Sequence, residues 1–411
     1  MGLYIKLAWR NIWRNKRRSM VVITSIGMGV FLMIITMALV NGMNYQMIDN
    51  TISTSLGHIS IHRKGFIENI KPSFSFTPPA GIHERITGVD RVAGAAPRIK
   101  IQGMIRSSEA SQGVVVTGID PEREKSVSNL ESYMSGSEGE GYPDNSDGDW
   151  IIISAQTAEK LDLVPGDRLV IMFQDASDQI VAEAFYLRGL FVSPVDTFDK
   201  FTVFTGIRKL QSVASMGNAI SEISIRTETR DDSIDVCSLI SGYVHGDDIE
   251  TLTWQQMAPS IMSAIRLYDA MMLIFFGIIF ITVIFSVANT MIMAIMERFH
   301  EIGVMKCIGT RPLYIFIMIT AESVNLGLAG MVSGLAASLS VTGILFYTGM
   351  DLSVFSESMR IWGTGSIIYP LVMLKDIISS MGIVLLTAII SSLYPALKAA
   401  RIKPMEALNF I

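Results

Sequence analysis

Four long apolar segments, almost free of charge, constrain the fold of this chain more than any other feature. They cover residues 19–42, 270–296, 313–347 and 377–397. About 20 consecutive apolar residues are enough for a helix to cross a bilayer. Half of the 411 residues are hydrophobic and only 17% are charged, which is too apolar for an ordinary soluble protein. The sequence therefore predicts four transmembrane helices.

The charged residues orient these helices. Basic residues without acids precede the first segment, and further basic residues follow the second and the fourth. Since basic residues in short flanking loops favour the cytoplasmic side, we expect both termini (1–18 and 398–411) and residues 297–312 to be cytoplasmic. Residues 43–265 then lie outside, with 18 Lys plus Arg against 30 Asp plus Glu, as does a loop at 348–376. The formal net charge of −5 thus combines an acidic outer domain with a basic inner rim.

The outer segment 43–265 has the pattern of a mixed α/β domain. Runs rich in β-branched and aromatic residues predict strands, and runs with helical periodicity predict helices between them. The predicted strands are 57–62, 113–118, 150–153, 168–173, 184–191, 201–204 and 222–226, and the predicted helices are 79–87, 154–161, 207–215 and 233–243. The acidic, glycine-rich stretch 135–149 has little to bury, so we expect a loop there.

The N-terminal residues 1–18 predict an amphipathic helix in the headgroup region. Trp9 and Trp13 would anchor it at the interface, while Arg10 and Arg14 would face phosphates. A plain basic flank of the first span is the alternative.

The sequence offers no convincing catalytic or metal site. His58 and His62 share one strand face without a third ligand nearby, so we interpret them as solvated histidines rather than a metal site. The acidic stretch 135–149 lacks the spacing of an EF-hand loop, and no Gly-x-Ser-x-Gly elbow occurs. Cys237 and Cys307 fall on opposite sides of the membrane, so no disulfide is expected.

A phosphate-binding loop is also absent from the sequence. The pattern G-x-x-x-x-G-K-[ST] does not occur, and neither does the dipeptide Gly-Lys. We therefore expect a non-enzymatic chain without a cofactor of its own. If it transports against a gradient, a separate ATPase must bind ATP and Mg²⁺ and supply the work.

The segment that follows the second span suggests where such an ATPase would bind. Glu297-Arg-Phe-His-Glu-Ile-Gly-Val-Met-Lys-Cys-Ile-Gly-Thr310 resembles the ER-x-x-EIG-x-x-K-x-x-G signature of FtsX-like ABC permeases, the family of lipoprotein-releasing and MacB-type exporters. The ending 394–408 resembles the tail of the same family. In that family the cytoplasmic ATPase binds this helix. The alternative is that the segment is a self-capped helix that only connects two spans. The resemblance implies coupling residues Glu297, Arg298, Glu301, Ile302, Gly303, Lys306 and Gly309.

The third span contains small residues on one face. Gly327, Gly330 and Gly334 let helices approach closely in lipid, either within this chain or against a second permease. Glu322 in the same span is costly in lipid, so we expect it to point into the bundle or toward the interface rather than to relay protons.

The resemblance covers nearly the whole chain and implies an α+β membrane protein. Its four transmembrane helices would carry a large mixed α/β extracytoplasmic domain of the MacB type, with two lobes, between helices 1 and 2. Two permeases, identical or homologous, would stand beside two ABC ATPase subunits in a bacterial inner membrane. They would expel an amphiphilic substrate from the outer leaflet or the periplasm.

Lipoprotein release is the favoured function, because the chain length and the stretch Thr251-Leu-Thr-Trp-Gln-Gln256 resemble that branch. Export of a peptide, antibiotic or lipid, signal transmission to a periplasmic partner, and ligand sensing are the alternatives. Binding of a periplasmic chaperone is less expected, since the stretch 212–218 lacks the proline of a chaperone-binding loop.

Overall fold

The computed structural model describes residues 16–134, 139, 141–243, 246 and 248–403, which form two compact units. The membrane unit contains the described residues up to Asn44 together with Ile265–Asp351 and those from Ile367 onward. The outer unit contains Tyr45–Ala264 and Leu352–Ser366. Each unit is described by itself below.

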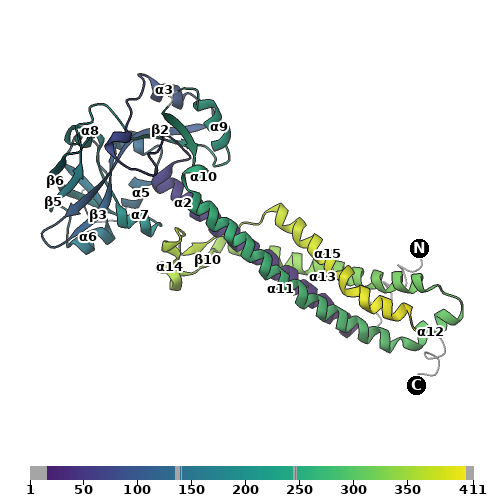
Figure 1. The fold of residues 1–411 in the computed structure, drawn as a ribbon. Coiled ribbons are helices and arrows are strands. Elements are labelled where there is room, and N and C mark those ends of the chain that lie inside the picture. The colour runs from purple at the N-terminus through teal and green to yellow at the C-terminus, as the bar shows by residue number, and fades with distance from the viewer. Residues whose placement is uncertain (1–15, 135–138, 140, 244–245, 247, 404–411) are drawn as a thin grey trace. The chain divides into compact units, whose positions relative to one another are not determined.

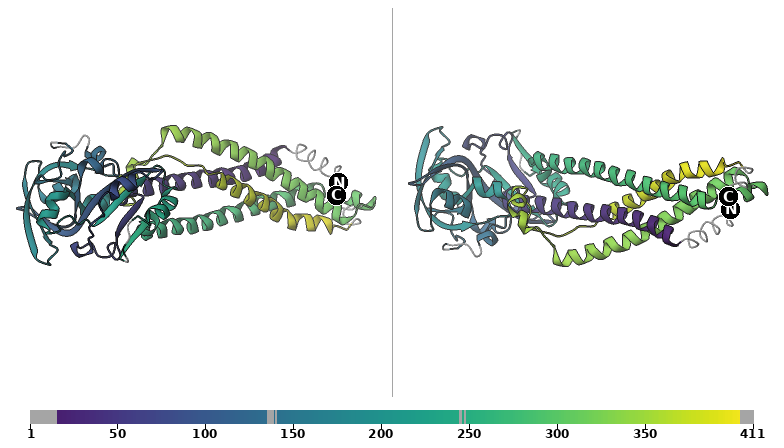
Figure 2. Two further views of the ribbon diagram at one scale, coloured as in Figure 1. Left: turned by 90° about the horizontal axis from the view of Figure 1, so that it is seen from above. Right: turned by 90° about the horizontal axis from the view of Figure 1, so that it is seen from below.

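Long apolar helices build the membrane unit, and among the described residues four are long and apolar enough to cross a membrane. Each contains one of the predicted spans and extends beyond it at both ends, as Figures 1 and 2 show. They are α2 (Lys16–Thr51), α11 (Pro259–Glu297), α13 (Pro312–Thr348) and α15 (Leu374–Ala400). A shorter helix, α12 (Phe299–Cys307), connects α11 to α13, and a short hairpin of β10 (Met350–Asp351) and β11 (Ile367–Ile368) follows α13.

The glycines of α13 make close contacts within this chain. A Cβ atom at Gly330 would stand 2.7 Å from Cβ of Ile26, and one at Gly334 would stand 2.4 Å from the Gly27 carbonyl oxygen, both in α2. At Gly327 the added atom would lie 2.8 Å from Cβ of Ala388 in α15. The small-residue face of α13 is therefore occupied by α2 and α15.

One nine-stranded sheet organises the outer unit, in the order β3-β7-β4-β6-β5-β2-β8-β1-β9. A further pairing of β3 with β2 closes a ring of six strands, and β8, β1 and β9 continue the sheet from the first half of β2. The strands are β1 (Ile59–Arg63), β2 (Val92–Arg106), β3 (Ser111–Ile119), β4 (Trp150–Ser154), β5 (Arg168–Gln174), β6 (Ile180–Phe191), β7 (Thr202–Gly206), β8 (Glu222–Thr227) and β9 (Ile249–Thr253).

The long strand β2 joins two lobes. Its first half, up to Arg98, pairs with β8, whereas Gly103–Arg106 pairs with β5 and the whole second half with β3. The inserted lobe is the six-stranded ring, and the other lobe is formed by the segments on either side of it in the sequence. This agrees with the two-lobed domain that the resemblance implied.

Short helices cover the sheet and connect its strands. They are α3 (Ile82–Thr87), α4 (Pro121–Glu124), α5 (Leu130–Met134), α6 (Ala155–Leu161), α7 (Asp196–Phe201), α8 (Ile207–Val213), α9 (Ser233–Ile240), α10 (Trp254–Met257) and α14 (Ser356–Ile361). A π-helical turn, Ile52–Leu56, follows α2, and 3₁₀ turns occupy Pro72–Phe74 and Ser353–Phe355. Every strand and helix predicted in the outer segment overlaps an observed one.

One expectation about the outer segment was wrong. His58 and His62 are buried rather than solvated: the His58 ring is bonded to Thr227 of β8, and the His62 ring lies 3.3 Å from Glu250 of β9. Burial, reinforced by Arg226, lowers the pKa of His58, whose Nδ1 accepts a hydrogen bond from the Thr227 amide at 2.9 Å. Within the described residues no group of three His, Cys, Asp or Glu side chains is arranged to hold a metal ion. Residues 352–366, the middle of the expected loop 348–376, belong to the outer unit.

Candidate functional site

The helix α12 forms a tight corner between α11 and α13 at one end of the membrane unit (Figure 1). Its C-terminal end is closed by Gly309, whose φ of +96° strains any residue with a Cβ. The Gly309 amide donates to the Lys306 carbonyl, and the Thr310 amide donates to the Met305 carbonyl at 3.0 Å. These bonds satisfy carbonyls that the helix leaves open, so α12 ends in a capped turn. Pro312 then begins α13 at a position that tolerates proline.

Ion pairs attach the N-terminal end of α12 to the helix bundle of the membrane unit. The Arg298 guanidinium bonds Glu322 of α13 at 3.1 Å and Glu301 at 3.3 Å, and Arg18 of α2 bonds Glu297 at 2.7 Å. Arg18 also lies 3.9 Å from Glu322, whose side chain is buried. Glu322 therefore points into the bundle, where two guanidinium groups compensate its charge.

Lys306 attaches the C-terminal end of α12 to the end of α15. Its ammonium donates to the carbonyl oxygens of Ala400 at 2.8 Å and Ile402 at 2.6 Å, at the C-terminal end of α15. Helix C-termini leave their last carbonyls without partners and carry partial negative charge, so a lysine is well placed there. The helix α12 is thus tied to α2, α13 and α15 by charged side chains.

The predicted coupling residues divide into an inner and an outer set. Ile302 and Gly303 are buried, and Ile302 belongs to the apolar core of the bundle. Arg298 and Lys306 make the bonds described above. Glu297, Glu301 and Gly309 are exposed, and Ile308, which the signature does not include, is 81% exposed. The large apolar side chain of Ile308 is thus mostly uncovered within the membrane unit. The predicted interfacial residues Trp9, Arg10, Trp13 and Arg14 lie outside the described residues.

We expect Arg298→Met to destabilise the membrane unit by about 2–3 kcal/mol, because it removes the 3.1 Å ion pair between Arg298 and the buried Glu322 carboxylate. Thermal unfolding of the full-length protein in detergent measures the loss. Glu322→Gln in the Arg298→Met background should recover most of it, since the buried charge is then gone. Equal unfolding temperatures for the wild type and Arg298→Met would show that the ion pair does not fasten α12.

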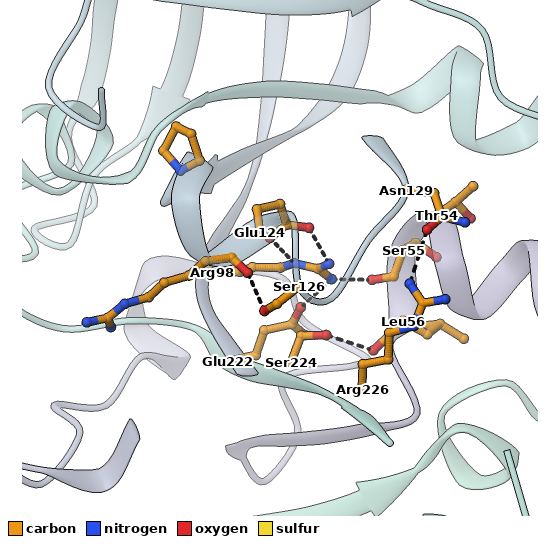
Figure 3. A network of polar contacts seen from close by, with 12 residues as sticks. Thr54, Ser55, Leu56, Arg98, Glu124, Ser126, Asn129, Glu222, Ser224 and Arg226 are labelled. Atoms are coloured by element: carbon orange, nitrogen blue, oxygen red, sulfur yellow. Dashed lines mark hydrogen bonds and ion pairs between the residues drawn. The ribbon is translucent and has the colours of Figure 1, made fainter. Parts of the chain in front are cut away.

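A second charged cluster lies in the outer unit, where the chain leaves α2 (Figure 3). Arg98 of β2 is buried and makes two bonds to Glu124 of α4, at 3.0 and 2.6 Å. Its third nitrogen donates to the carbonyl of Ser55 in the π-helical turn at 2.6 Å. Glu222 of β8 lies 3.6 Å away and bonds Lys100 at 2.7 Å. This cluster links the turn after α2 to both lobes of the outer domain.

Opposite charges outweigh burial in this cluster. Burial by itself lowers the pKa of Arg98, but Glu124 and Glu222 raise it above its usual value. For Glu222, burial acts to raise the pKa, and Lys100 with Arg98 holds it below its usual value. Arg98 and Glu222 therefore stay charged at neutral pH. Sequence analysis missed the cluster, because its members are far apart in the chain.

A third cluster connects α14 to the rest of the outer unit. The Arg360 guanidinium bonds the buried carboxylate of Asp199 in α7 at 2.7 Å. Both oxygens of Asp199 also accept the Ser193 amide, each at 3.2 Å. The Asn50 side-chain amide donates to the Gly363 carbonyl at 2.9 Å. The segment 352–366 is therefore held on the outer unit from two sides.

Burial raises the pKa of Asp199 to about 6, against the opposing effect of the Ser193 hydrogen bonds and Arg360, and with a smaller rise from Asp196. Since the folded protein holds this proton more tightly than the unfolded chain, the Asp199 contribution to stability should decline as pH rises from about 4 to about 6. Unfolding temperatures of the wild type and Asp199→Asn, measured side by side in detergent across this range, test the effect. Relative to the Asp199→Asn variant, the wild type should lose stability with rising pH; a constant difference would contradict the burial argument.

Comparison with known families identifies this architecture. An outer α/β domain inserted before three further apolar helices, with a capped helix between the second and third, defines a multi-pass membrane permease of the ABC type. The MacB-like periplasmic core domain matches residues 19–236, and the FtsX-like permease C-terminal domain matches residues 273–404. The chain belongs to this FtsX/MacB family of ABC transporter permeases, and the matched outer domain makes it a membrane protein with a periplasmic domain.

The individual relatives differ in how much of this chain they match. The lipoprotein-releasing system transmembrane protein LolC of Xylella fastidiosa is 22% identical over 97% of this chain and 96% of its own length. The macrolide export ATP-binding/permease protein MacB of Chlorobium luteolum is 32% identical, but over only 30% of this chain and 16% of its own. Among solved structures, the extracellular domain of the transporter YknZ covers 48% of this chain at 18% identity, with a TM-score of 0.34.

Proposed function

We propose that this chain is the permease subunit of an ATP-driven transporter that releases lipoproteins from the outer leaflet of the bacterial inner membrane. The observation that carries this proposal is the end-to-end similarity to LolC, which covers the outer domain and all four spans. MacB relatives match only a limited part of the chain. The chain lacks a phosphate-binding loop, so the work of ATP hydrolysis would come from a partner ATPase.

The exposed side of α12 is the proposed contact with that ATPase. Ile308 would insert into an apolar cleft of the partner, with Glu301 and Glu297 at the polar rim. The buried members of the signature, Ile302 and Gly303, would transmit the movement by keeping α12 packed on the bundle. The bonds of Arg298 and Lys306 serve the same purpose, since a loosely attached helix would absorb the motion instead of passing it on.

The outer domain would receive the movement through α2. This helix is continuous from Lys16 to Thr51 and ends in the π-helical turn that Arg98 holds. A rotation or shift of α2 would therefore act on β2 and α4 at once. The proposed mechanism is mechanical, and no bond in the substrate is made or broken by this chain.

The membrane unit offers an environment suited to an amphiphile. Most of α11 exposes apolar side chains, among them Leu273, Ile274 and Phe285. A cavity of about 370 Å³ between α2, α11 and α15 combines apolar walls with polar groups, including Asn41 and Asp376. Acyl chains would contact the apolar walls, and the polar part of the substrate would lie toward the outer domain.

The complete transporter would contain two ATPase subunits and a second permease, identical or homologous. Both termini of this chain and α12 would be cytoplasmic, in agreement with the basic residues beside the spans. Export of a peptide, antibiotic or lipid is the second candidate, favoured by the 32% identity to MacB over 125 residues. A further alternative is transmission of a signal to a periplasmic partner without transport. It would use the same α12, α2 and outer domain.

Depletion of this chain in its own bacterium distinguishes these functions. Lipoprotein release predicts that outer-membrane lipoproteins accumulate in the inner-membrane fraction on a density gradient. Complementation with the wild type should restore their distribution, as should Val164→Glu, which alters an exposed apolar residue of the outer domain. Normal lipoprotein fractionation together with new sensitivity to an exported compound would refute lipoprotein release in favour of MacB-type export.

A further inference from the structure

The connection between the third and fourth spans contains an amphipathic element. The segment 352–366 is closed at its base by the pairing of β10 with β11 and by a hydrogen bond from the Leu352 amide to the Ser366 carbonyl at 2.8 Å. Between these points lie a 3₁₀ turn, Ser353–Phe355, and the helix α14, Ser356–Ile361. The segment is thus an ordered projection rather than an extended link.

One side of this segment is polar and bonds to other residues of the outer unit. Arg360 reaches Asp199 at 2.7 Å, and the Gly363 carbonyl accepts the Asn50 side chain. Thr364 is buried and its hydroxyl donates to the Met359 carbonyl at 3.1 Å. These contacts fix the direction of the segment on the outer unit.

The remaining surface of the projection is strongly apolar. Val354 is 92% exposed, Phe355 58%, Ile361 60% and Trp362 52%. Val354 and Phe355 belong to the 3₁₀ turn, and Ile361 and Trp362 lie at the C-terminal end of α14. Arg360, next to them in the sequence, is directed to Asp199 instead. A short segment that holds its arginine in an ion pair with a buried carboxylate and exposes its aliphatic and aromatic side chains is unusual for a surface in water.

Chain connectivity restricts what can cover this surface. The helix α13 ends at Thr348, directly after the 85% exposed Tyr347, a residue type that favours the membrane interface. Val354 follows Thr348 by six positions, which corresponds to at most about 20 Å of extended chain. The other end of the segment leads back into the membrane through α15. The apolar surface is therefore tethered at both ends to the outer side of the bilayer.

We propose that Val354, Phe355, Ile361 and Trp362 form a membrane foot, on which the outer domain rests in the headgroup and upper acyl region of the outer leaflet. This inference rests on the proposed function only for its topology, in which the segment and the outer domain lie outside. Aliphatic and aromatic side chains with a polar opposite side are the composition of interfacial anchors. The foot would hold the domain against the leaflet from which the substrate is taken, and Arg360 with Asp199 would connect it to the domain.

Fluorescence quenching in nanodiscs tests the foot. A bimane label is placed at Val354→Cys or, as a matched exposed control on the outer unit, at Val164→Cys or Ile180→Cys, each in a Cys237→Ala/Cys307→Ser background. Lipids brominated near the headgroup end of the acyl chain should quench the label at position 354 at least about twofold and leave the two controls nearly unchanged. Equal, weak quenching at all three positions would overturn the proposal.

A second measurement covers the case in which the cysteine background does not fold. A photoreactive benzoylphenylalanine replaces Phe355 in the otherwise unchanged chain in native membranes. Cross-links to phospholipid support the foot, whereas cross-links to a second copy of this chain or to another protein overturn it. Both readouts are independent of transport, so a lipid-bound foot in a protein that does not release lipoproteins would refute only the proposed function.

Discussion

Arg98→Met should lower the free energy of unfolding of the outer domain by about 3–5 kcal/mol, because it leaves the buried Glu124 carboxylate without its bidentate partner. The substitution also removes the 2.6 Å bond from Arg98 to the Ser55 carbonyl, so the turn after α2 keeps the longer contact of Lys100 in β2 to that oxygen, at 3.4 Å. Denaturant unfolding of the full-length protein in detergent, followed by tryptophan fluorescence, measures the change. If the chain has the proposed function, lipoprotein release should also fall, even at temperatures where the domain remains folded.

The double variant Arg98→Met/Glu124→Leu is the matched control. It removes both charges and keeps similar apolar volume, so stability should recover by a large fraction of the loss. Transport should not recover to the same degree, because the bond to the π-helical turn is still missing. A double variant no more stable than the single one would contradict the argument that an uncompensated charge causes the loss.

Ile308→Glu should separate the permease from its ATPase while leaving the permease folded. An exposed apolar side chain that anchors a partner contributes on the order of 2 kcal/mol or more, which corresponds to roughly a 30-fold loss of affinity. Co-purification of the ATPase and ATP hydrolysis coupled to release should both fall accordingly. Thermal stability should stay near that of the wild type, because Ile308 is 81% exposed.

A substitution of the buried Ile302 is the comparison for Ile308→Glu. Ile302→Ala removes apolar volume from the bundle core, so it should lower the unfolding temperature as well as ATPase binding. If the Ile308→Glu variant binds the ATPase normally, α12 is not part of the interface with the ATPase. A large loss of stability in Ile308→Glu would mean that its effect on binding is indirect.

The sequence predicted those parts of the fold that depend on local pattern. The four spans follow from runs of apolar residues, and strands such as β4 and β5 follow from dense β-branched and aromatic residues. The strand β2 was missed, since it begins with the small residues and proline of Val92-Ala-Gly-Ala-Ala-Pro97. The short strand β9 was missed because a polar stretch precedes it and Glu250 lies within it.

The candidate site was predictable in location but not in detail. The signature placed the coupling helix between the second and third spans, where α12 is found. It did not show that Arg298 and Lys306 turn toward the bundle, since Glu322 and the end of α15 are distant in sequence. The Arg98 and Asp199 clusters depend on strand order and on the position of residues 352–366, which pairing over long distances decides. Local patterns carry no information on such contacts.

Site-specific photocross-linking tests the central claim, that a cytoplasmic ATPase engages this permease at α12. Benzoylphenylalanine is placed at Ile308 or, as a control of similar exposure at the opposite end of α13, at Tyr347, and the chain is irradiated in native membranes. We predict that position 308 cross-links to a protein with a phosphate-binding loop and that position 347 does not. The absence of such an ATPase at position 308, or its equal recovery at position 347, would contradict the account.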